Sequence, residues 1–349
     1  MATRHTLRCI LLLLLGTLAL GNMGTAAAAD AGGTANAAGA DPNPRSPYWR
    51  AVRAGVDGTT TVRGAERGEL IDNTGENWRA LRNGIVASVM PWSIVLSALV
   101  IAVFYAWRGR IRLEEPPGDA RVVRWSLLER TVHWYTALLF IVLALTGCSL
   151  LLGRALLIPL VGHAAFSTYA ELAMRTHNLA GPAFAFGLAA MIALWARDNI
   201  PRAIDLEWFR RAGGMGKGAR HAPAGRMNGG EKAWFWFIAT AGVAVVASGL
   251  VLDFPNLQQR REVMAVANLV HGLGALAWTA LALGHIYIGT LGTEGALEGM
   301  LRGDVSATWA RQHHDHWYAG KVGTAGRAGT RPDDPPAASG TRLTPPGDA

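Results

Sequence analysis

One apolar segment constrains the fold of this chain more than any other. Residues 263–288 (VMAVANLVHGLGALAWTALALGHIYI) are long and apolar enough to cross a lipid bilayer as one helix, and they carry His271 and His285. The two histidines are fourteen positions apart, about 40° around a helix and about 21 Å along its axis. They therefore share one face, one in each leaflet. Ionisable side chains at membrane depth are expensive, so each histidine needs a partner on a neighbouring helix.

The composition indicates a multi-pass membrane protein. Half of the 349 residues are hydrophobic and they gather in blocks. The net charge of +8 lies mainly on Lys and Arg residues in the loops between these blocks, which the positive-inside rule explains without a nucleic-acid partner. The only cysteines are Cys9 and Cys148, so the chain has no disulfide framework and no four-thiolate iron-sulfur cluster of its own.

The N-terminal residues have the pattern of a secretory signal peptide. Arg4 and Arg8 precede an apolar run at 10–20, and small residues lead up to Ala29. A retained membrane anchor is the alternative, but the apolar run is short for a span.

The remaining blocks and loops give a division of the whole chain. Four blocks besides the first are predicted to span the membrane, at 85–107, 131–152, 178–196 and 233–252. The polar segment before them has too few large apolar residues for a core. The predicted divisions are a signal peptide at 1–29, a polar extracytoplasmic segment at 30–83, an extra transmembrane helix at 84–108, a cytoplasmic loop at 109–130, a four-helix domain at 131–290, and a cytoplasmic tail at 291–349 that is disordered at its end.

The predicted topology pairs four histidines by depth. His133 lies where the second span leaves the cytoplasmic side, and His285 lies where the fifth span returns to it. His177 and His271 lie where the third and fifth spans begin on the outer side. His163, in a loop predicted at 153–176, is the rival to His177.

Two imidazoles at one depth can bind a haem iron from both sides. Both axial positions are then filled, so such a centre transfers electrons and leaves no position for a substrate. Small residues near the histidines would let a porphyrin approach, although they also serve ordinary helix packing. These glycines are Gly147, Gly181, Gly187, Gly272, Gly274 and Gly284. Arg130 and Arg175 are candidates to pair with haem propionates, with interfacial snorkelling as the alternative.

A second histidine cluster lies in the tail. His313, His314 and His316 have a spacing that could bind a metal, but a solvated, partly structural tail is favoured.

Five motifs resemble the cytochrome b (gamma) subunit of respiratory membrane-bound formate dehydrogenase. They are LLERTVHW, RTHNLAGP, NGGEKAWFW, VHGLGALAWTALALGHIY and GTLGTEGALEGMLRGDVSATWARQHHDHW, within about residues 77–317. The resemblance implies an all-α integral membrane protein, a four-helix di-haem b bundle preceded here by one extra transmembrane helix. It implies two haem b groups, one held by His177 and His271 and the other by His133 and His285.

The resemblance also implies a function. Quinone binding in the family involves an Asn-x-Gly before the third bundle helix, here Asn228 and Gly230, together with His285; a helix cap is the other reading of Asn228. The chain would carry electrons from an iron-sulfur (beta) subunit through the haems to membrane quinone, in the inner membrane of a bacterium. Formate would be oxidised on a catalytic molybdenum or tungsten (alpha) subunit. The mature N-terminus would be periplasmic and the C-terminus cytoplasmic.

Two other functions remain open from the residues alone. The first is a cytochrome b subunit of a hydrogenase or thiosulfate-type reductase, because no residue of this chain contacts the primary substrate. The second is a haem-free anchor or transporter.

Overall fold

The computed structural model describes residues 46–54, 56, 58–59, 61, 69–71, 74–216, 221–257 and 259–329. The predicted signal peptide at 1–29 and the end of the tail at 330–349 lie outside these described residues. The chain divides into two compact units, Met1–Ala54 and Gly55–Ala349. The first contributes helix α2 (Ser46–Arg53), and the second contributes every element described below.

Among the described residues, five continuous helical segments are long and apolar enough to cross a membrane. This confirms the predicted all-α membrane architecture of one extra span followed by four. The segments are Asn77–Arg108, Leu127–Leu156, Ile158–Trp195, Gly229–Asp253 and Arg261–Gly292. They comprise α3 (Thr74–Leu81), η2 (Arg82–Val89) and α4 (Trp92–Arg108), then α5 (Leu127–Leu156), α6 (Ile158–Trp195), α8 (Gly229–Phe237), η4 (Ile238–Gly242), α9 (Val243–Asp253), α10 (Arg261–Tyr287) and η6 (Ile288–Gly292).

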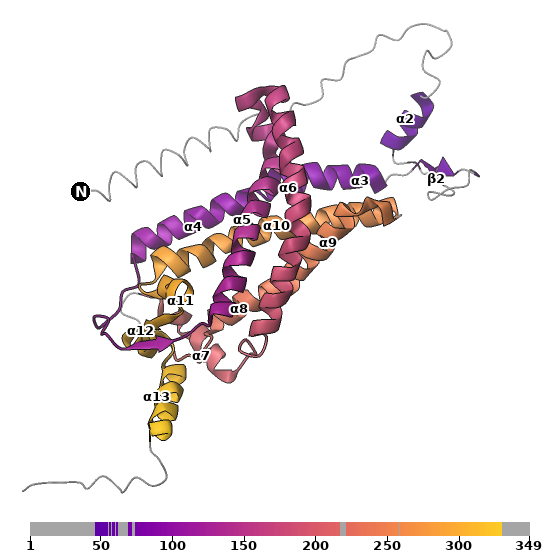
Figure 1. The fold of residues 1–349 in the computed structure, drawn as a ribbon. Coiled ribbons are helices and arrows are strands. Elements are labelled where there is room, and N and C mark those ends of the chain that lie inside the picture. Colours follow the sequence, from indigo (N-terminus) through magenta and orange to yellow (C-terminus); the bar gives the residue numbers. More distant parts are fainter. Residues whose placement is uncertain are drawn as a thin grey trace, which may run out of the picture. The chain divides into compact units, whose positions relative to one another are not determined.

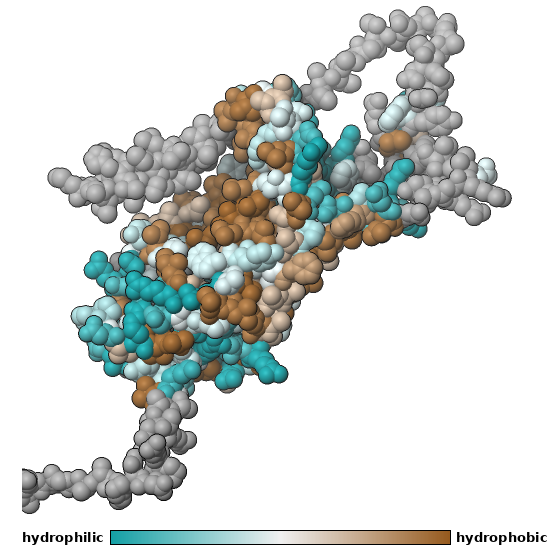
Figure 2. All heavy atoms as spheres, in the orientation of Figure 1, coloured by the Kyte–Doolittle hydropathy of each residue, from teal (hydrophilic) through white to brown (hydrophobic). Residues whose placement is uncertain are grey.

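Helix α10 packs mainly against α9 and α4 (Figure 1). Helices α3 and α4 run along one side of it, α9 runs along another, and α5 pairs with α6. The apolar core lies where α6, η4, α9 and α10 meet, and its buried members are Phe184, Leu188, Ile238, Val245, Trp278 and Ala282. Figure 2 shows brown apolar surface over these helices and teal hydrophilic surface around α11 and α12. This apolar surface is the surface that a bilayer would cover.

The predicted outer loop at 153–176 is wrong, because this segment is helical. Helix α5 continues to Leu156, and α6 begins at Ile158 with Pro159 in its first turn. The chain changes direction at Gly162, whose φ of 79° is a conformation that glycine adopts without strain. No further glycine or proline occurs before Gly181, so α6 is not interrupted there. His177 therefore lies inside a long helix and not at its start.

The extra span also begins earlier than the predicted boundary at 84. Helix α3 and the π-helix η2 lead into α4 without a loop, so 74–83 is helical and not irregular. Before it, β1 (Gly58–Thr59) and β2 (Glu69–Ile71) form a short antiparallel pair.

One end of the bundle is closed by a small folded unit, which we call the cap. It consists of β3 (Arg121–Val123), α11 (Ala296–Arg302), β4 (Asp304–Ser306) and α12 (Ala307–His313). Strands β3 and β4 pair antiparallel, and Gly303, with a φ of 96°, ends α11 in the left-handed conformation. Val305, Trp309 and Ala310 are buried in the cap. Helix α13 (Asp315–Gly329) follows it, and α7 (Ala203–Arg210) and η3 (Ala212–Gly214) precede α8.

We call the end that carries the cap the basic end, because α4 ends there at Arg108 and β3 begins there at Arg121.

Candidate functional site

Two pairs of histidines face one another at two levels of α10. His271 of α10 lies beside His177 of α6, with ring centroids 6.0 Å apart. His285 of α10 lies beside His133 of α5, with ring centroids 6.3 Å apart. Two imidazoles that bind one metal atom from opposite sides, through bonds of about 2 Å, place their ring centroids about 6 Å apart. The structure thus brings together the same two pairs that the sequence suggested, each at the spacing of an axial ligand pair.

The pair distant from the basic end, His177 and His271, is fixed by hydrogen bonds that each Nδ1–H donates. The Thr146 hydroxyl donates to the Val142 carbonyl oxygen at 2.7 Å, so it accepts from His177 Nδ1–H at 2.9 Å. His271 Nδ1–H donates to the Val245 carbonyl oxygen at 2.9 Å. In both rings this leaves Nε2 as the unprotonated nitrogen, which is the form in which imidazole binds a metal.

The pair at the basic end is held by aromatic rings. Trp234 of α8 stacks on His285 with ring centroids 5.0 Å apart and planes at 14°. Trp134 meets His133 edge to face at 5.2 Å and donates from Nε1 to the Met300 carbonyl oxygen in the cap. Nδ1 of His133 is buried and has no hydrogen-bond partner. This pair therefore has rings placed by packing and less hydrogen bonding than the other pair.

The glycines near the histidines divide into two groups. A Cβ at Gly147 would lie 3.1 Å from His177 Cε1, and one at Gly249 would lie 2.9 Å from His271 Cε1. A Cβ at Gly181 or Gly284 would meet no atom within 4 Å. These positions leave room beside the imidazoles. Gly187, Gly272 and Gly274 instead contact side chains of neighbouring helices, which is the helix-packing role.

These observations fit a b haem bound by two histidines at each level. The donors are neutral imidazoles in facing pairs, two of them have their tautomer fixed, and glycines leave space beside them. Between the two levels, Trp278 lies 5.2 Å from Phe140 and 5.6 Å from Phe184, so an aromatic cluster separates the pairs.

Three other predicted residues lie apart from the histidine pairs. His163 lies exposed on α6. Arg130 donates from Nη1 to the Leu301 carbonyl oxygen at 2.7 Å and so ties α5 to the cap. Arg175 pairs with Glu171 at 2.6 Å on an exposed face.

Asn228 caps helix α8. Its Oδ1 accepts from Glu231 N–H at 2.9 Å, and Glu231 Oε2 accepts from Asn228 N–H at 2.8 Å, which is a reciprocal capping box. Gly230 packs on Trp208, because a Cβ there would lie 2.6 Å from the indole. The Asn228 Nδ2–H donors take no part in the cap.

A buried ionic network next to this helix start was missed from the sequence. Arg124 is 5 % exposed and donates from Nη2 to Glu231 Oε1 at 2.7 Å. Burial is the largest effect on the Arg124 guanidinium and lowers its pKa. Lys232 of α8 binds both carboxylate oxygens of Asp205, at 2.9 and 2.8 Å. The only sequence signal for this network was the NGGEK pattern, which was interpreted as a helix start.

The tail histidines lie in different surroundings. His314 is 1 % exposed, and His313 is partly buried against Trp309 with ring centroids 5.1 Å apart. Of the solvated, partly structural tail that the sequence predicts, His313 and His314 belong to the structural part, because both pack against Trp309. His316 is exposed, with a side-chain exposure of 62 %.

Two known proteins with similar sequences are cytochrome b556 subunits of formate dehydrogenases. The cytochrome b556 subunit of the nitrate-inducible formate dehydrogenase of Escherichia coli is 27% identical over 201 residues, which cover 56% of this chain and 90% of that protein. The formate dehydrogenase cytochrome b556 subunit of Haemophilus influenzae is 27% identical over 213 residues, covering 60% of this chain and 87% of that protein. The family model described as prokaryotic cytochrome b561 matches residues 124–303, more than half of the sequence, and the chain belongs to that family.

Proposed function

We propose that this chain is the di-haem b-type cytochrome subunit of a formate dehydrogenase complex, and that the complex reduces membrane quinone. The family implies haem b, and the relatives are formate dehydrogenase subunits. In this proposal His177 and His271 hold one haem, and His133 and His285 hold the other. A haem with two histidine ligands supplies one-electron transfer. The observation that carries the proposal is the pair of facing imidazole contacts, at 6.0 and 6.3 Å, at the two levels of one helix.

The proposed orientation follows from charge. Arginines gather in the loops of the basic end, which the positive-inside rule places in the cytoplasm. The C-terminal tail is then cytoplasmic and the mature N-terminus periplasmic, in a bacterial inner membrane. An iron-sulfur subunit would dock at the opposite end, near His177 and His271. The catalytic molybdenum or tungsten subunit would bind formate and contact the iron-sulfur subunit.

The proposed quinone site lies at the start of α8. Asn228 Oδ1 is occupied by the helix cap, so its Nδ2–H group is the donor available to a quinone carbonyl. Gly230 keeps Trp208 seated beside this helix start, and Trp234 stacks on His285 one turn further along. These residues would bind and orient quinone next to the basic-end histidine pair.

A substitution at Asn228 separates the quinone role from the cap role. Aspartate caps helices as well as asparagine does, but it lacks the amide donor. The purified chain with its haems would be reduced and mixed with ubiquinone-1, and haem reoxidation would be followed by absorbance. Asn228→Asp should slow reoxidation by about 2- to 13-fold, which corresponds to the about 0.5–1.5 kcal/mol that one hydrogen bond contributes. Reoxidation at the wild-type rate would contradict the proposed site, and no reoxidation of the wild type would contradict quinone reduction.

A further inference from the structure

The cap contains titratable side chains that the proposed function does not use. His221, His313 and His314 lie between solvent and the start of α8. They form a series in which His221 is in ring contact with His313, the neighbouring His313 and His314 share Trp309, and His314 faces Glu231.

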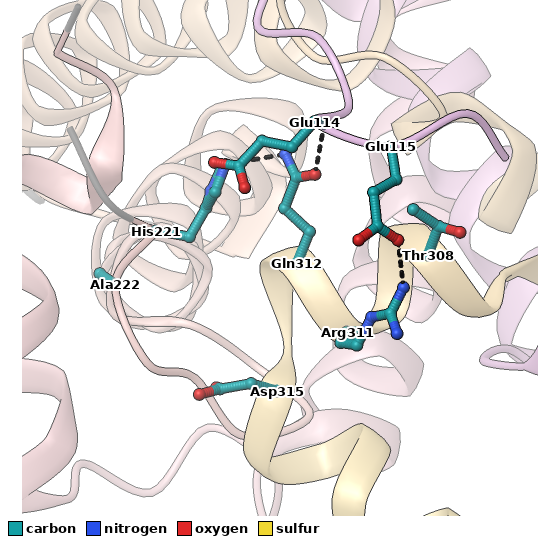
Figure 3. A pocket seen from close by; sticks show the side chains of 8 residues that line it. All are labelled: Glu114, Glu115, His221, Ala222, Thr308, Arg311, Gln312 and Asp315. Carbon is teal, nitrogen blue, oxygen red and sulfur yellow. Dashed lines mark hydrogen bonds and ion pairs between the residues drawn. The ribbon is translucent and has the colours of Figure 1, made fainter. Parts of the chain in front are cut away.

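The series begins at a cavity of about 410 Å³ (Figure 3). Glu114, Glu115 and Asp315 line it together with His221 and Gln312. Gln312 Nε2–H donates to His221 Nε2 at 2.7 Å, and Glu114 Oε1 lies 3.7 Å from the same nitrogen. Arg311, which also lines the cavity, pairs with Glu115. Burial lowers the pKa of His221, Glu114 opposes this effect and Arg108 adds to it, so the cavity brings solvent to a neutral imidazole.

The middle of the series is formed by the two tail histidines. The rings of His221 and His313 are in edge-to-face contact, with centroids 4.8 Å apart. His313 and His314 each pack against Trp309 at 5.1 Å. Nε2 of His313 is buried without a protein partner, which is a position that an internal water satisfies.

The inner end of the series is the contact between His314 and Glu231. His314 Nδ1–H donates to the Gly225 carbonyl oxygen at 2.8 Å, so its Nε2 carries a lone pair. That nitrogen faces Glu231 Oε2 at 4.0 Å, and Glu231 is paired with Arg124. Glu231 Oε2 also accepts from Asn228 N–H at 2.8 Å, so this carboxylate joins the inner end of the series to the start of α8.

We propose that His221, His313 and His314 form the proton-uptake route by which protons from solvent at this cavity reach quinone at the start of α8. This inference rests on the proposed function. Reduction of one quinone to quinol consumes two electrons, supplied by the partner complex, and two protons. The protons come from water at the cavity, and each histidine regains its original protonation state after each passage.

The histidines of the route are neutral at rest. Burial, together with the charges of His221, His314 and Arg124, lowers the pKa of His313 to about 3, and Glu231 opposes this effect. Burial is also the main reason that the pKa of His314 is well below its usual value, with Arg124 adding to the effect and Asp315 opposing it. At pH 7 a group with a pKa of about 3 is protonated on the order of 10⁻⁴ of the time.

The test compares His313→Gln with His316→Gln in the full-length chain carrying its haems. Glutamine keeps polar atoms at position 313 but cannot take up and release a proton. His316 is exposed two residues after His314, outside the series, and is the matched control. The reduced protein would be mixed with ubiquinone-1, and haem reoxidation and proton uptake would be recorded together, the latter with a pH-indicator dye.

We expect His313→Gln to slow proton uptake and reoxidation at least tenfold at pH 7.5, with unchanged haem content. Added imidazole should restore part of the rate, and His316→Gln should match the wild type. Wild-type rates in His313→Gln, or a loss that imidazole does not restore, would overturn the route. If His313→Gln does not fold, His221→Gln at the half-buried cavity wall gives the same comparison. A wild-type protein that never reduces quinone would instead contradict the proposed function.

Discussion

The two histidine pairs of α10 are held in different ways. His177 and His271 each donate from Nδ1 to a fixed acceptor within the apolar bundle. His133 has no partner for Nδ1, and His285 is positioned by a stacked indole. The first pair is therefore preorganised by hydrogen bonds, and the second is placed by packing beside a charged cap. The difference suits the proposed division of roles, in which one pair only transfers electrons and the other lies next to the proposed quinone site and proton route.

The largest expected effect comes from removing one ligand at each level. His271→Ala should remove the haem of the distant pair, and His285→Ala the haem of the basic-end pair, because one remaining imidazole leaves an axial position empty. Each variant should fall from two haems per chain to about one, measured as pyridine haemochrome per mole of protein.

The exposed His163 provides the control for that loss. His163→Ala should keep two haems, because His163 lies on the exposed face of α6. Two haems in His271→Ala would refute the pairing. One haem in His163→Ala would make His163 a ligand in place of His177.

A bulkier residue at Gly249 should affect the distant pair alone. The added Cβ would lie 2.9 Å from His271 Cε1, so the imidazole has to move. Crowding of this kind costs about 1–3 kcal/mol, or about 5- to 150-fold in haem affinity at that level. Gly84→Ala, in η2 of the extra span, meets no protein atom and is the matched control. Spectral titration with haem measures the haem affinity of both variants. Equal affinity in Gly249→Ala and wild type would contradict the assignment of His271 as a haem ligand.

As the pH is lowered, the cap at the basic end should lose stability before the surroundings of the distant histidine pair do. The folded cap keeps His313 neutral, with a pKa of about 3, whereas the unfolded segment is protonated near 6.5. The unfolded state binds more protons between these values, so stability rises with pH there and is lost as pH falls from about 6.5 toward 3. At pH 5 this raises the equilibrium constant for unfolding of the cap by up to about 30-fold. Limited proteolysis of the tail at pH 5 and 7.5 measures it. His313→Gln should reduce the difference in cleavage rate between the two pH values. An unchanged difference would mean that groups other than His313 cause it.

The smallest effect concerns the hydrogen bond that orients His177. Thr146→Val removes the acceptor of His177 Nδ1–H, worth about 0.5–1.5 kcal/mol. A less electron-rich imidazole stabilises the reduced haem, so the midpoint potential of the distant haem should rise by about 20–65 mV at about 59 mV per tenfold. The basic-end haem should not change. Thr146→Ser keeps the hydroxyl and should retain the wild-type potential; an equal shift of both haems would contradict the local role.

The sequence predicted the spans and histidine pairs because both depend on patterns that repeat along a helix. Blocks of apolar residues and a fourteen-residue spacing need no knowledge of the partner helices. The cap was not predicted, because Arg124 and Glu231 are 107 positions apart and their contact depends on the chain folding back. The length of α6 was also missed. Its polar residues between Gly162 and His177 suggested a loop, although nothing there interrupts a helix.

The most direct test of the central claim is a redox titration of the purified full-length chain produced with ample haem. Two facing imidazole pairs predict two haem b per chain and two one-electron transitions at different potentials, since the pairs differ in hydrogen bonding and surroundings. A colourless protein, or one with a single haem and a single transition, would contradict the account.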